Sequence, residues 1–127
     1  MQKTVITTSR IAPPAGPFSP AIRAGDSVYV SGQVAQDPAT GKLIDGDVTR
    51  QTEQIFENIV AVLQEAGLTL RDVVRVGVFL ADMRDFQPMN AVYARWFEAP
   101  YPARTTVGVA SLPLGALVEI EILARTS

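Results

Sequence analysis

The sequence predicts an α+β fold, in which two helices cover one face of a five- or six-stranded β-sheet. Segments with alternating apolar residues, typical of strands, surround two segments of helical periodicity, in the order β, β, α, β, α, β, β. Hydrophobic residues make up 47% of the 127 residues and charged residues 19%, which is the balance of a globular protein. Because no repeat, low-complexity tract or linker divides the chain, we expect a single domain over residues 1–127.

The first part of the chain predicts two strands and two loops. Residues 4–7 form a short strand, and residues 12–20, which include four prolines, form an irregular, stiff loop. Residues 27–34 form a second strand, with Val28, Val30 and Val34 on one face and Tyr29, Ser31 and Gln33 on the other. Gly32 in this strand indicates a bulge or a close approach of another group. Residues 37–46 are polar and rich in turn formers, and we expect a surface loop.

Two amphipathic segments predict the helices. Asp47 is a good N-cap for a helix over residues 48–66, whose apolar stripe consists of Ile55, Phe56, Ile59, Val62, Leu63 and Ala66. Asp85 is expected to cap a second helix that ends near Phe97, with a stripe of Phe86, Met89, Tyr93, Trp96 and Phe97. Asn90 lies inside this second stripe, where an apolar residue is expected.

Three further segments predict the remaining strands. Residues 73–81 form a strand with Val74, Val76, Val78 and Leu80 on one face. Residues 104–110 and 117–124 are predicted to form a hairpin around the loop 111–115, and Val118, Ile120, Ile122 and Ala124 make the apolar face of its second strand. The sheet face without helices then carries Tyr29, Ser31, Gln33, Arg75, Phe79, Leu117, Glu119, Glu121, Leu123 and Arg104 or its neighbour. Such a mixed face indicates an oligomer interface that contains polar sites.

The composition excludes several kinds of chemistry. The chain has no cysteine and no histidine, which excludes disulfides, thiolate nucleophiles, the usual zinc ligands and imidazole catalysis. Its net charge of −2 gives no indication of a nucleic-acid partner. We find neither a signal-peptide pattern nor an apolar segment long enough to span a membrane, and we therefore expect no membrane contact and a cytoplasmic location.

Several collinear motifs together resemble the Rid family, also called YjgF, and most closely its RidA branch of enamine/imine deaminases. They cover nearly the whole chain and are GPFSP (16–20), SGQV (31–34), DPATGKLIDGDVTRQT (37–52), EAGLTLRDVV (65–74), MNAVYARWF (89–97), YPARTTV (101–107) and VEIE (118–121). The resemblance implies a chorismate-mutase-like fold with a mixed sheet and two helices on one face. It also implies a homotrimer, in which the sheets form a central barrel and three clefts lie between subunits.

The resemblance further implies hydrolysis of 2-imino acids, such as 2-iminobutanoate and 2-iminopropanoate, to 2-keto acids and ammonia without a metal or other cofactor. It assigns Arg104 to the substrate carboxylate and Glu119 to the attacking water. The implied pocket residues are Ser31, Asn90, Thr106 and Phe18. Thr106 replaces a frequent cysteine that acts largely through its backbone, and Phe18 replaces a tyrosine, so that one pocket hydroxyl is lost.

Each of these residues also has a structural interpretation. Without the resemblance, Arg104 is expected to form an ion pair with a glutamate across the hairpin, and Glu119 and Glu121 to lie on a solvated strand face. Asn90 is equally compatible with an amide that binds the helix backbone. Ser31 is compatible with an ordinary small polar strand residue, and Phe18 with loop packing.

Other functions stay open at the level of the sequence. Members of the family are also described as translation inhibitors, ribonucleases or chaperone-like proteins. The negative charge and the absence of histidine disfavour a ribonuclease of the usual acid–base type. The remaining alternatives are a regulatory protein that binds a small metabolite without turnover, and a specialised aminoacrylate deaminase.

Overall fold

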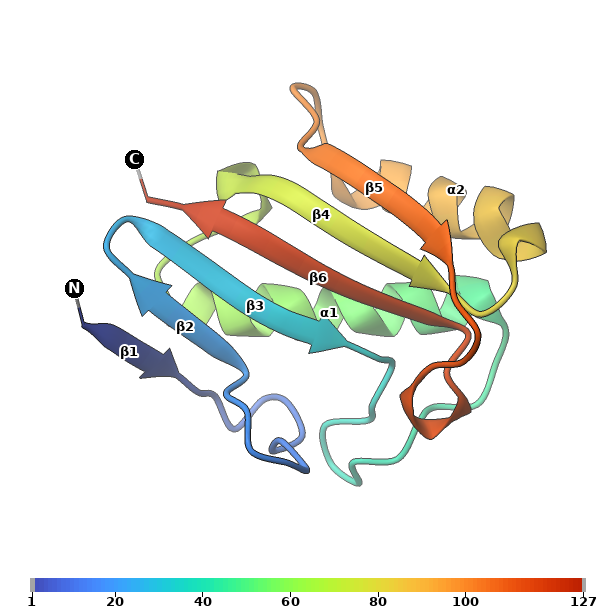
Figure 1. Cartoon of the computed structure of the whole chain (residues 1–127), viewed down its shortest axis with the longest axis horizontal. Coiled ribbons are helices and arrows are strands. Elements are labelled where there is room, and N and C mark those ends of the chain that lie inside the picture. The colour runs from blue at the N-terminus through green and yellow to red at the C-terminus, as the bar shows by residue number, and fades with distance from the viewer. Residues whose placement is uncertain (1, 127) are drawn as a thin grey trace.

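A computed structural model describes residues 2–126 as one six-stranded sheet with two helices on one of its faces (Figure 1). The strands are β1 (Lys3–Ile6), β2 (Ala21–Ala24), β3 (Ser27–Gln33), β4 (Val73–Leu80), β5 (Ala103–Gly108) and β6 (Val118–Arg125), in the spatial order β1-β2-β3-β6-β4-β5. The helices are α1 (Val48–Glu65) and α2 (Phe86–Trp96), with short 3-10 helices η1 (Leu70–Asp72), η2 (Met83–Asp85) and η3 (Pro113–Gly115). All neighbouring strands are antiparallel except β4 and β5, so the predicted α+β fold with a mixed sheet is confirmed.

The predicted hairpin between the last two strands is wrong. β5 pairs in parallel with β4, with Arg104 opposite Val76, while β6 lies between β3 and β4 in the middle of the sheet (Figure 1). The segment β4–α2–β5 is a crossover unit, and a helix is the usual connection between adjacent parallel strands. The loop after β5 then returns the chain past the end of β4, where the Val109 amide donates to the Leu80 carbonyl at 2.9 Å.

Two details of the strands also differ from the expectation. β2, which directly follows Pro20, was not predicted and pairs with both β1 and β3. Val74 does not share a face with the buried Val76, because the register between β4 and β6 shifts between Val73 and Arg75. Val74 is consequently 43% exposed, whereas Val73 is 6% exposed. Such a shift is a β-bulge, which turns one extra side chain away from its expected face.

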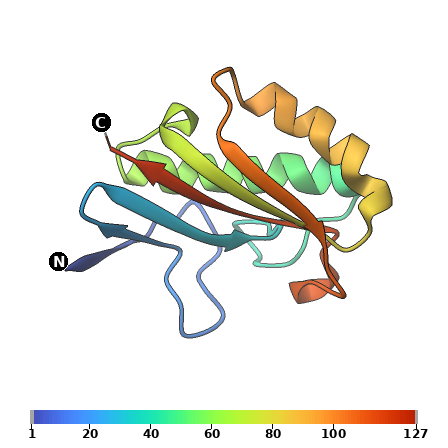
Figure 2. The same ribbon diagram turned by 45° about the horizontal axis from the view of Figure 1, so that its top comes forward.

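The core lies between the sheet and the two helices, which are on the same side of the sheet (Figure 2). Val118, Ile120 and Ala124 of β6 are fully buried there, as the alternation in this strand predicted. Phe56 of α1 is surrounded by Tyr93, Trp96 and Phe97 at centroid distances of 5.9, 5.6 and 5.5 Å. These aromatic contacts join the two predicted helix stripes. Neither helix in the described part of the chain is long and apolar enough to cross a membrane.

The ends of the helices are stabilised from different parts of the chain. Asp47 caps α1 as predicted, because its carboxylate accepts a hydrogen bond from the Arg50 amide at 3.0 Å. The last turn of α1 has no basic residue of its own, but Arg10 and Arg23 donate to the carbonyls of Ala61 and Ala66 at 3.0 and 2.6 Å. Their positive charges complement the C-terminal end of the helix dipole.

The expected cap of α2 forms only in part. Asp85 occupies the N-cap position, but its side chain makes no capping hydrogen bond. Asp82 caps the preceding η2 instead, since its carboxylate accepts from the Arg84 amide at 2.9 Å.

Candidate active site

The six predicted site residues form two groups on opposite faces of the sheet. Arg104, Asn90 and Thr106 lie on the helix-covered face near α2, and we call them, with Phe86 and Tyr93, the arginine cluster. Glu119, Ser31 and Phe18 line a cavity on the other face, and we call them, with Gly32 and Glu121, the glutamate cluster. We refer to the sheet face without helices as the open face.

The guanidinium of Arg104 is held by one face of α2. Its Nη1 donates to Oδ1 of Asn90 at 2.7 Å, and its Cζ lies 4.5 Å from the ring centroid of Tyr93 and 5.7 Å from that of Phe86. These three residues follow each other at intervals of four and three, so they share one side of the helix. Asn90 therefore binds the arginine rather than the helix backbone.

Arg104 keeps most of its hydrogen-bonding capacity. Among residues 2–126 it forms no ion pair with a carboxylate, and the ion pair across a hairpin is excluded because that hairpin does not exist. A guanidinium has five N–H donors, of which Asn90 occupies one. The remaining donors can bind a carboxylate through two parallel bonds.

Two polar atoms beside the arginine have no partner within the described part of the chain. The hydroxyl oxygens of Tyr93 and Thr106 are both buried and without a hydrogen bond. Burial raises the pKa of Tyr93 above its usual value, while the nearby Arg104 charge acts in the opposite direction. Buried polar groups in proteins are normally paired, so the arginine cluster has polar groups that a ligand or a neighbouring subunit can satisfy.

The glutamate cluster surrounds a cavity of about 610 Å³ on the open face. A Cβ atom on Gly32 would lie 2.6 Å from Oε2 of Glu119, so this carboxylate is placed directly over the backbone of β3. Gly77 of β4 makes similar room for Glu121, whose Cγ lies 3.1 Å from the corresponding Cβ position. The prediction for Gly32 is confirmed in both respects, since the register of β3 and β6 also shifts between Val30 and Gln33.

The carboxyl group of Glu119 is shifted towards the protonated form. Partial burial raises its pKa, and the neighbouring carboxylate of Glu121 raises it further. Both effects act in the same direction because each disfavours the negative charge. A carboxylate with a raised pKa is a stronger base towards a bound water molecule, which is the property required of a general base.

Ser31 and Phe18 are linked through the proline-rich loop. The Ser31 hydroxyl donates to the Ser19 carbonyl at 2.6 Å, and its amide donates to the Pro20 carbonyl at 3.0 Å. These two hydrogen bonds hold the loop that carries Phe18 against β3. The Phe18 ring lines the cavity and remains 55% exposed, which is more than simple loop packing requires.

The sheet separates the two clusters within one chain. Arg104 points to α2, whereas Glu119 lies between Val118 and Ile120, which are buried on the helix side, and therefore points to the open face. The neighbour of Arg104 on the open face is Thr105, which accepts a hydrogen bond from Arg75 at 2.8 Å. A single chain thus does not bring Arg104 and Glu119 into one site.

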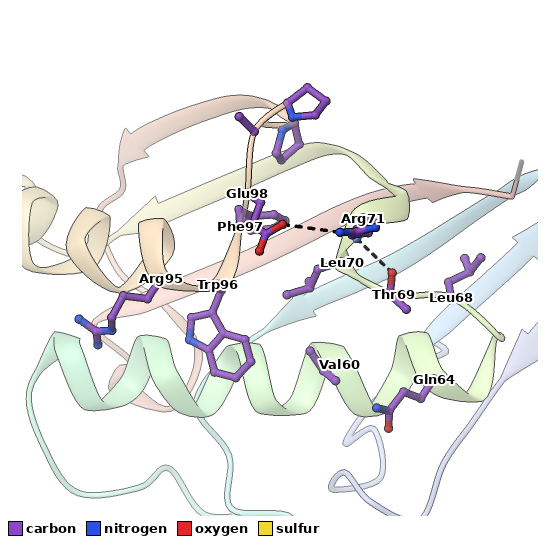
Figure 3. A pocket seen from close by; sticks show the side chains of 13 residues that line it. Val60, Gln64, Leu68, Thr69, Leu70, Arg71, Arg95, Trp96, Phe97 and Glu98 are labelled. Atoms are coloured by element: carbon purple, nitrogen blue, oxygen red, sulfur yellow. Dashed lines mark hydrogen bonds and ion pairs between the residues drawn. The ribbon is translucent and has the colours of Figure 1, made fainter.

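A second cavity of about 750 Å³ lies on the helix side, next to the connection between α2 and β5 (Figure 3). Trp96, Phe97 and Val60 contribute to its lining, and Arg71 and Glu98 approach each other across it at 3.7 Å. It contains none of the predicted site residues. Its other arginine, Arg95, is paired with Glu53, so this cavity offers no free charged group for catalysis.

Sequence reasoning missed the aromatic residues that hold Arg104. Phe86 and Tyr93 were predicted as core residues, but their spacing around Asn90 was a signal that all three face the same neighbour. Recognition of the β4–α2–β5 crossover could have identified that neighbour as Arg104. Between residues 2 and 126, no three carboxylates converge in an arrangement that could hold a metal ion.

The fold and the two clusters define a mixed α+β protein with polar site residues on both faces of one sheet. Residues 7–126 match the family described as Endoribonuclease L-PSP. A RutC family protein of Pyrococcus abyssi is 46% identical over 124 residues, covering 98% of each chain. The chain belongs to this family, also called the YjgF or Rid family, which confirms the resemblance found in the sequence.

Two further relatives carry more specific names. A protein of Dermatophagoides farinae named 2-iminobutanoate/2-iminopropanoate deaminase is 40% identical over 119 residues, covering 94% of this chain and 93% of that protein. The crystal structure of E. coli TdcF with bound serine is 37% identical with a TM-score of 0.92, covering 98% of this chain and 99% of that one. The predicted family and fold are therefore confirmed, and a named deaminase is among the similar proteins.

Proposed function

We propose that this protein hydrolyses reactive 2-imino acids, such as 2-iminobutanoate and 2-iminopropanoate, to 2-keto acids and ammonia. The observation that carries the proposal is the guanidinium of Arg104, which is oriented by Asn90 and has no carboxylate partner within residues 2–126. A 2-imino acid supplies such a carboxylate next to its reactive carbon. The name of the Dermatophagoides relative supports this substrate class, and serine bound to TdcF is a ligand of similar shape.

The proposed reaction needs only a few groups. Arg104 holds the substrate carboxylate through two charge-assisted hydrogen bonds. Glu119 takes a proton from water while the water oxygen bonds to the imine carbon and the C=N electron pair moves to nitrogen. The nitrogen then takes this proton from Glu119, which gives the neutral carbinolamine. Glu119 next takes the proton of the carbinolamine hydroxyl and passes it to the nitrogen, so the C–N bond breaks and ammonia leaves as the C–O bond becomes a carbonyl. Residues near Thr106 and Ser31 line the site, and no metal or organic cofactor takes part.

The site is proposed to form between two protomers, because one chain keeps Arg104 and Glu119 on opposite faces. In the proposed homotrimer, the open faces form a central barrel, and the arginine cluster of one protomer lies beside the glutamate cluster of the next. The open face supports this assembly, since Tyr29 is 50% exposed and Phe79 and Leu123 are only partly buried, whereas Leu117 packs against the core and not, as predicted, on this face. Light scattering at micromolar concentration should give three times the chain mass; a monodisperse monomer contradicts the trimer.

The decisive experiment measures ammonia release from freshly generated 2-iminobutanoate and 2-iminopropanoate, with and without EDTA. We expect acceleration above the buffer rate that EDTA does not change. Decay at the buffer rate with a folded trimer contradicts the enzyme and favours the alternative, a protein that binds a small metabolite without turnover. The replacement of a tyrosine by Phe18 is the feature that favours this alternative. The cytoplasmic location stays a prediction.

A further inference from the structure

The backbone of Leu114 has a conformation that a leucine rarely adopts. Its φ and ψ are 60° and 14°, and within residues 2–126 it is the one non-glycine residue with a positive φ. A residue with a Cβ is strained in this left-handed region, whereas glycine or asparagine adopts it readily. The turn itself therefore gives no reason for a leucine at this position.

Packing within the chain does not explain the leucine either. Leu114 is 59% exposed, and the loop around η3 is anchored to the core by Ala116, which is 1% exposed. The molecule thus keeps a large apolar side chain in water on a strained backbone. Strained backbone conformations of this kind are concentrated at functional sites, where the position of the side chain serves the function.

Leu114 lines the same cavity as Glu119 and Phe18. Four of the five polar side chains that line this cavity stand on the sheet and are Ser31, Gln33, Glu119 and Glu121, while the fifth, Gln36, follows β3 in the loop. Most apolar side chains come instead from the loops on either side, and are Ile11, Ala12, Pro14, Ala15, Phe18, Pro113 and Leu114. The cavity therefore combines a polar surface on the sheet with an apolar wall, in which Phe18 and Leu114 are 55% and 59% exposed.

We infer that Leu114 and Phe18 form an apolar subsite for the side chain of the substrate, and that the protein prefers 2-imino acids with longer aliphatic side chains. The inference rests on the proposed function, in which Arg104 and Glu119 engage the carboxylate and the imine carbon. The side chain is the remaining part of the substrate, and the apolar wall is the surface left for it.

The test compares straight-chain 2-imino acids whose side chains contain one to four carbons, each generated in situ from its amino acid. With the wild-type trimer, we expect kcat/KM to rise roughly fourfold with each methylene group that enters the apolar subsite. The readout is the ratio of kcat/KM for the four-carbon substrate to that for the one-carbon substrate. A flat or falling series that still lies above the buffer rate overturns the subsite and leaves the proposed function intact. Decay of every substrate at the buffer rate contradicts the proposed function itself.

Variants at Leu114 identify the side chain that is responsible. L114N and L114G should lower the ratio about tenfold, and both should raise the melting temperature because they relieve the backbone strain. L114M keeps the apolar area and should keep most of the ratio. The control is Val5→Ala, which removes a similarly exposed apolar side chain on β1 that does not line the cavity, and should not change the ratio. An unchanged ratio in L114N, or dissociation of its trimer by light scattering, overturns the inference.

Discussion

The arginine cluster and the glutamate cluster are held in different ways. Arg104 is fixed by Asn90, Tyr93 and Phe86, so its orientation is determined within one chain by a single helix. Within residues 2–126, Glu119 has no hydrogen-bond partner of this kind, and the lack of a side chain at Gly32 leaves the space that its carboxylate occupies. Contacts within one chain therefore preorganise the proposed anchor Arg104, whereas the proposed general base Glu119 depends on free space over Gly32 and on an uncovered face of the sheet.

The largest effect is expected for Arg104→Ala, which removes the proposed anchor of the substrate carboxylate. Two charge-assisted hydrogen bonds of about 1.5–3 kcal/mol each are lost, which corresponds to roughly 10²–10⁴-fold in kcat/KM. Misplacement of the imine carbon adds to this loss, so we expect no measurable activity. Arg104→Lys should restore little, because an ammonium lacks the planar fork. Near-normal turnover by a folded, trimeric Arg104→Ala variant rules out the anchor.

The next largest effect concerns Glu119, the proposed general base. Glu119→Gln should lower kcat by roughly 10²–10⁴-fold, because the amide cannot take a proton from water. The stability should not fall, since the neutral amide avoids the burial penalty and the repulsion by Glu121 that raise the pKa of Glu119. Activity and thermal unfolding are measured on the same preparation. A large loss of stability with retained activity assigns Glu119 a structural role.

A smaller loss of activity is expected for a substitution of Gly32, the glycine over which the Glu119 carboxylate lies. In Gly32→Ala the new Cβ would lie 2.6 Å from Oε2, so the flexible carboxylate must move. We expect activity to fall at least about tenfold with little loss of stability, since a displacement of about 1 Å can cost up to 10²-fold. Gly77→Ala is the matched control, because it displaces Glu121 instead. Equal activities of the two variants contradict the special position of Glu119.

Tyr93 tests the preorganisation of the arginine cluster. Tyr93→Leu removes the ring under the guanidinium, and a cation–π contact of about 0.5–2 kcal/mol corresponds to a roughly 2–30-fold rise in KM. Tyr93→Phe keeps the ring and removes a buried hydroxyl that has no partner among residues 2–126, so KM should hardly change and the melting temperature should rise. A loss of kcat in Tyr93→Phe shows instead that the hydroxyl contacts the substrate.

The smallest effect is a shift in the pH dependence. In the proposed reaction Glu119 acts as a base only when deprotonated, so its raised pKa should place the acidic limb of kcat/KM above the usual glutamate range. Glu121→Gln removes one of the two causes, so this limb should move to lower pH. The raised pKa also means that folded Glu119 binds its proton more tightly than the unfolded chain does. Its contribution to stability therefore falls as the pH rises from the unfolded pKa to the folded pKa, and is fully unfavourable above the folded pKa. An acidic limb that stays in place in Glu121→Gln contradicts the coupling.

The sequence was sufficient for elements whose side chains alternate cleanly or follow a helical stripe. The faces of β6 and the stripe of α1 were predicted correctly, because burial on one side determines the pattern. In β3 the alternation placed Gly32 on the face of Val28 and Val30, which is wrong, because the register shift after Val30 turns Gly32 towards Glu119 on the open face. The partners of β5 could not be read from its own pattern, because the position of a strand depends on its connections. β2 has four residues directly after Pro20, which is too short for a clear alternation.

The sequence indicated which residues belong to the candidate site. It did not indicate on which face of the sheet each of them lies. Motif similarity indicated Arg104 and Glu119, but their opposite faces follow from the parallel pairing of β5 with β4. Leu114 was not singled out, because a left-handed backbone at a leucine contradicts the usual preference of that residue. The roles of all six site residues, and the single domain, stay predictions.

Arg10 and Arg23 connect the N-terminal part of the chain to the last turn of α1. Because of these contacts, β2 cannot separate from the sheet without also breaking a charged hydrogen bond to the Ala66 carbonyl. The end of the helix and the N-terminal strands then open as one cooperative unit. In native-state hydrogen exchange, the amides of β2 and of the α1 terminus should share one opening free energy, although about 40 residues separate them along the chain.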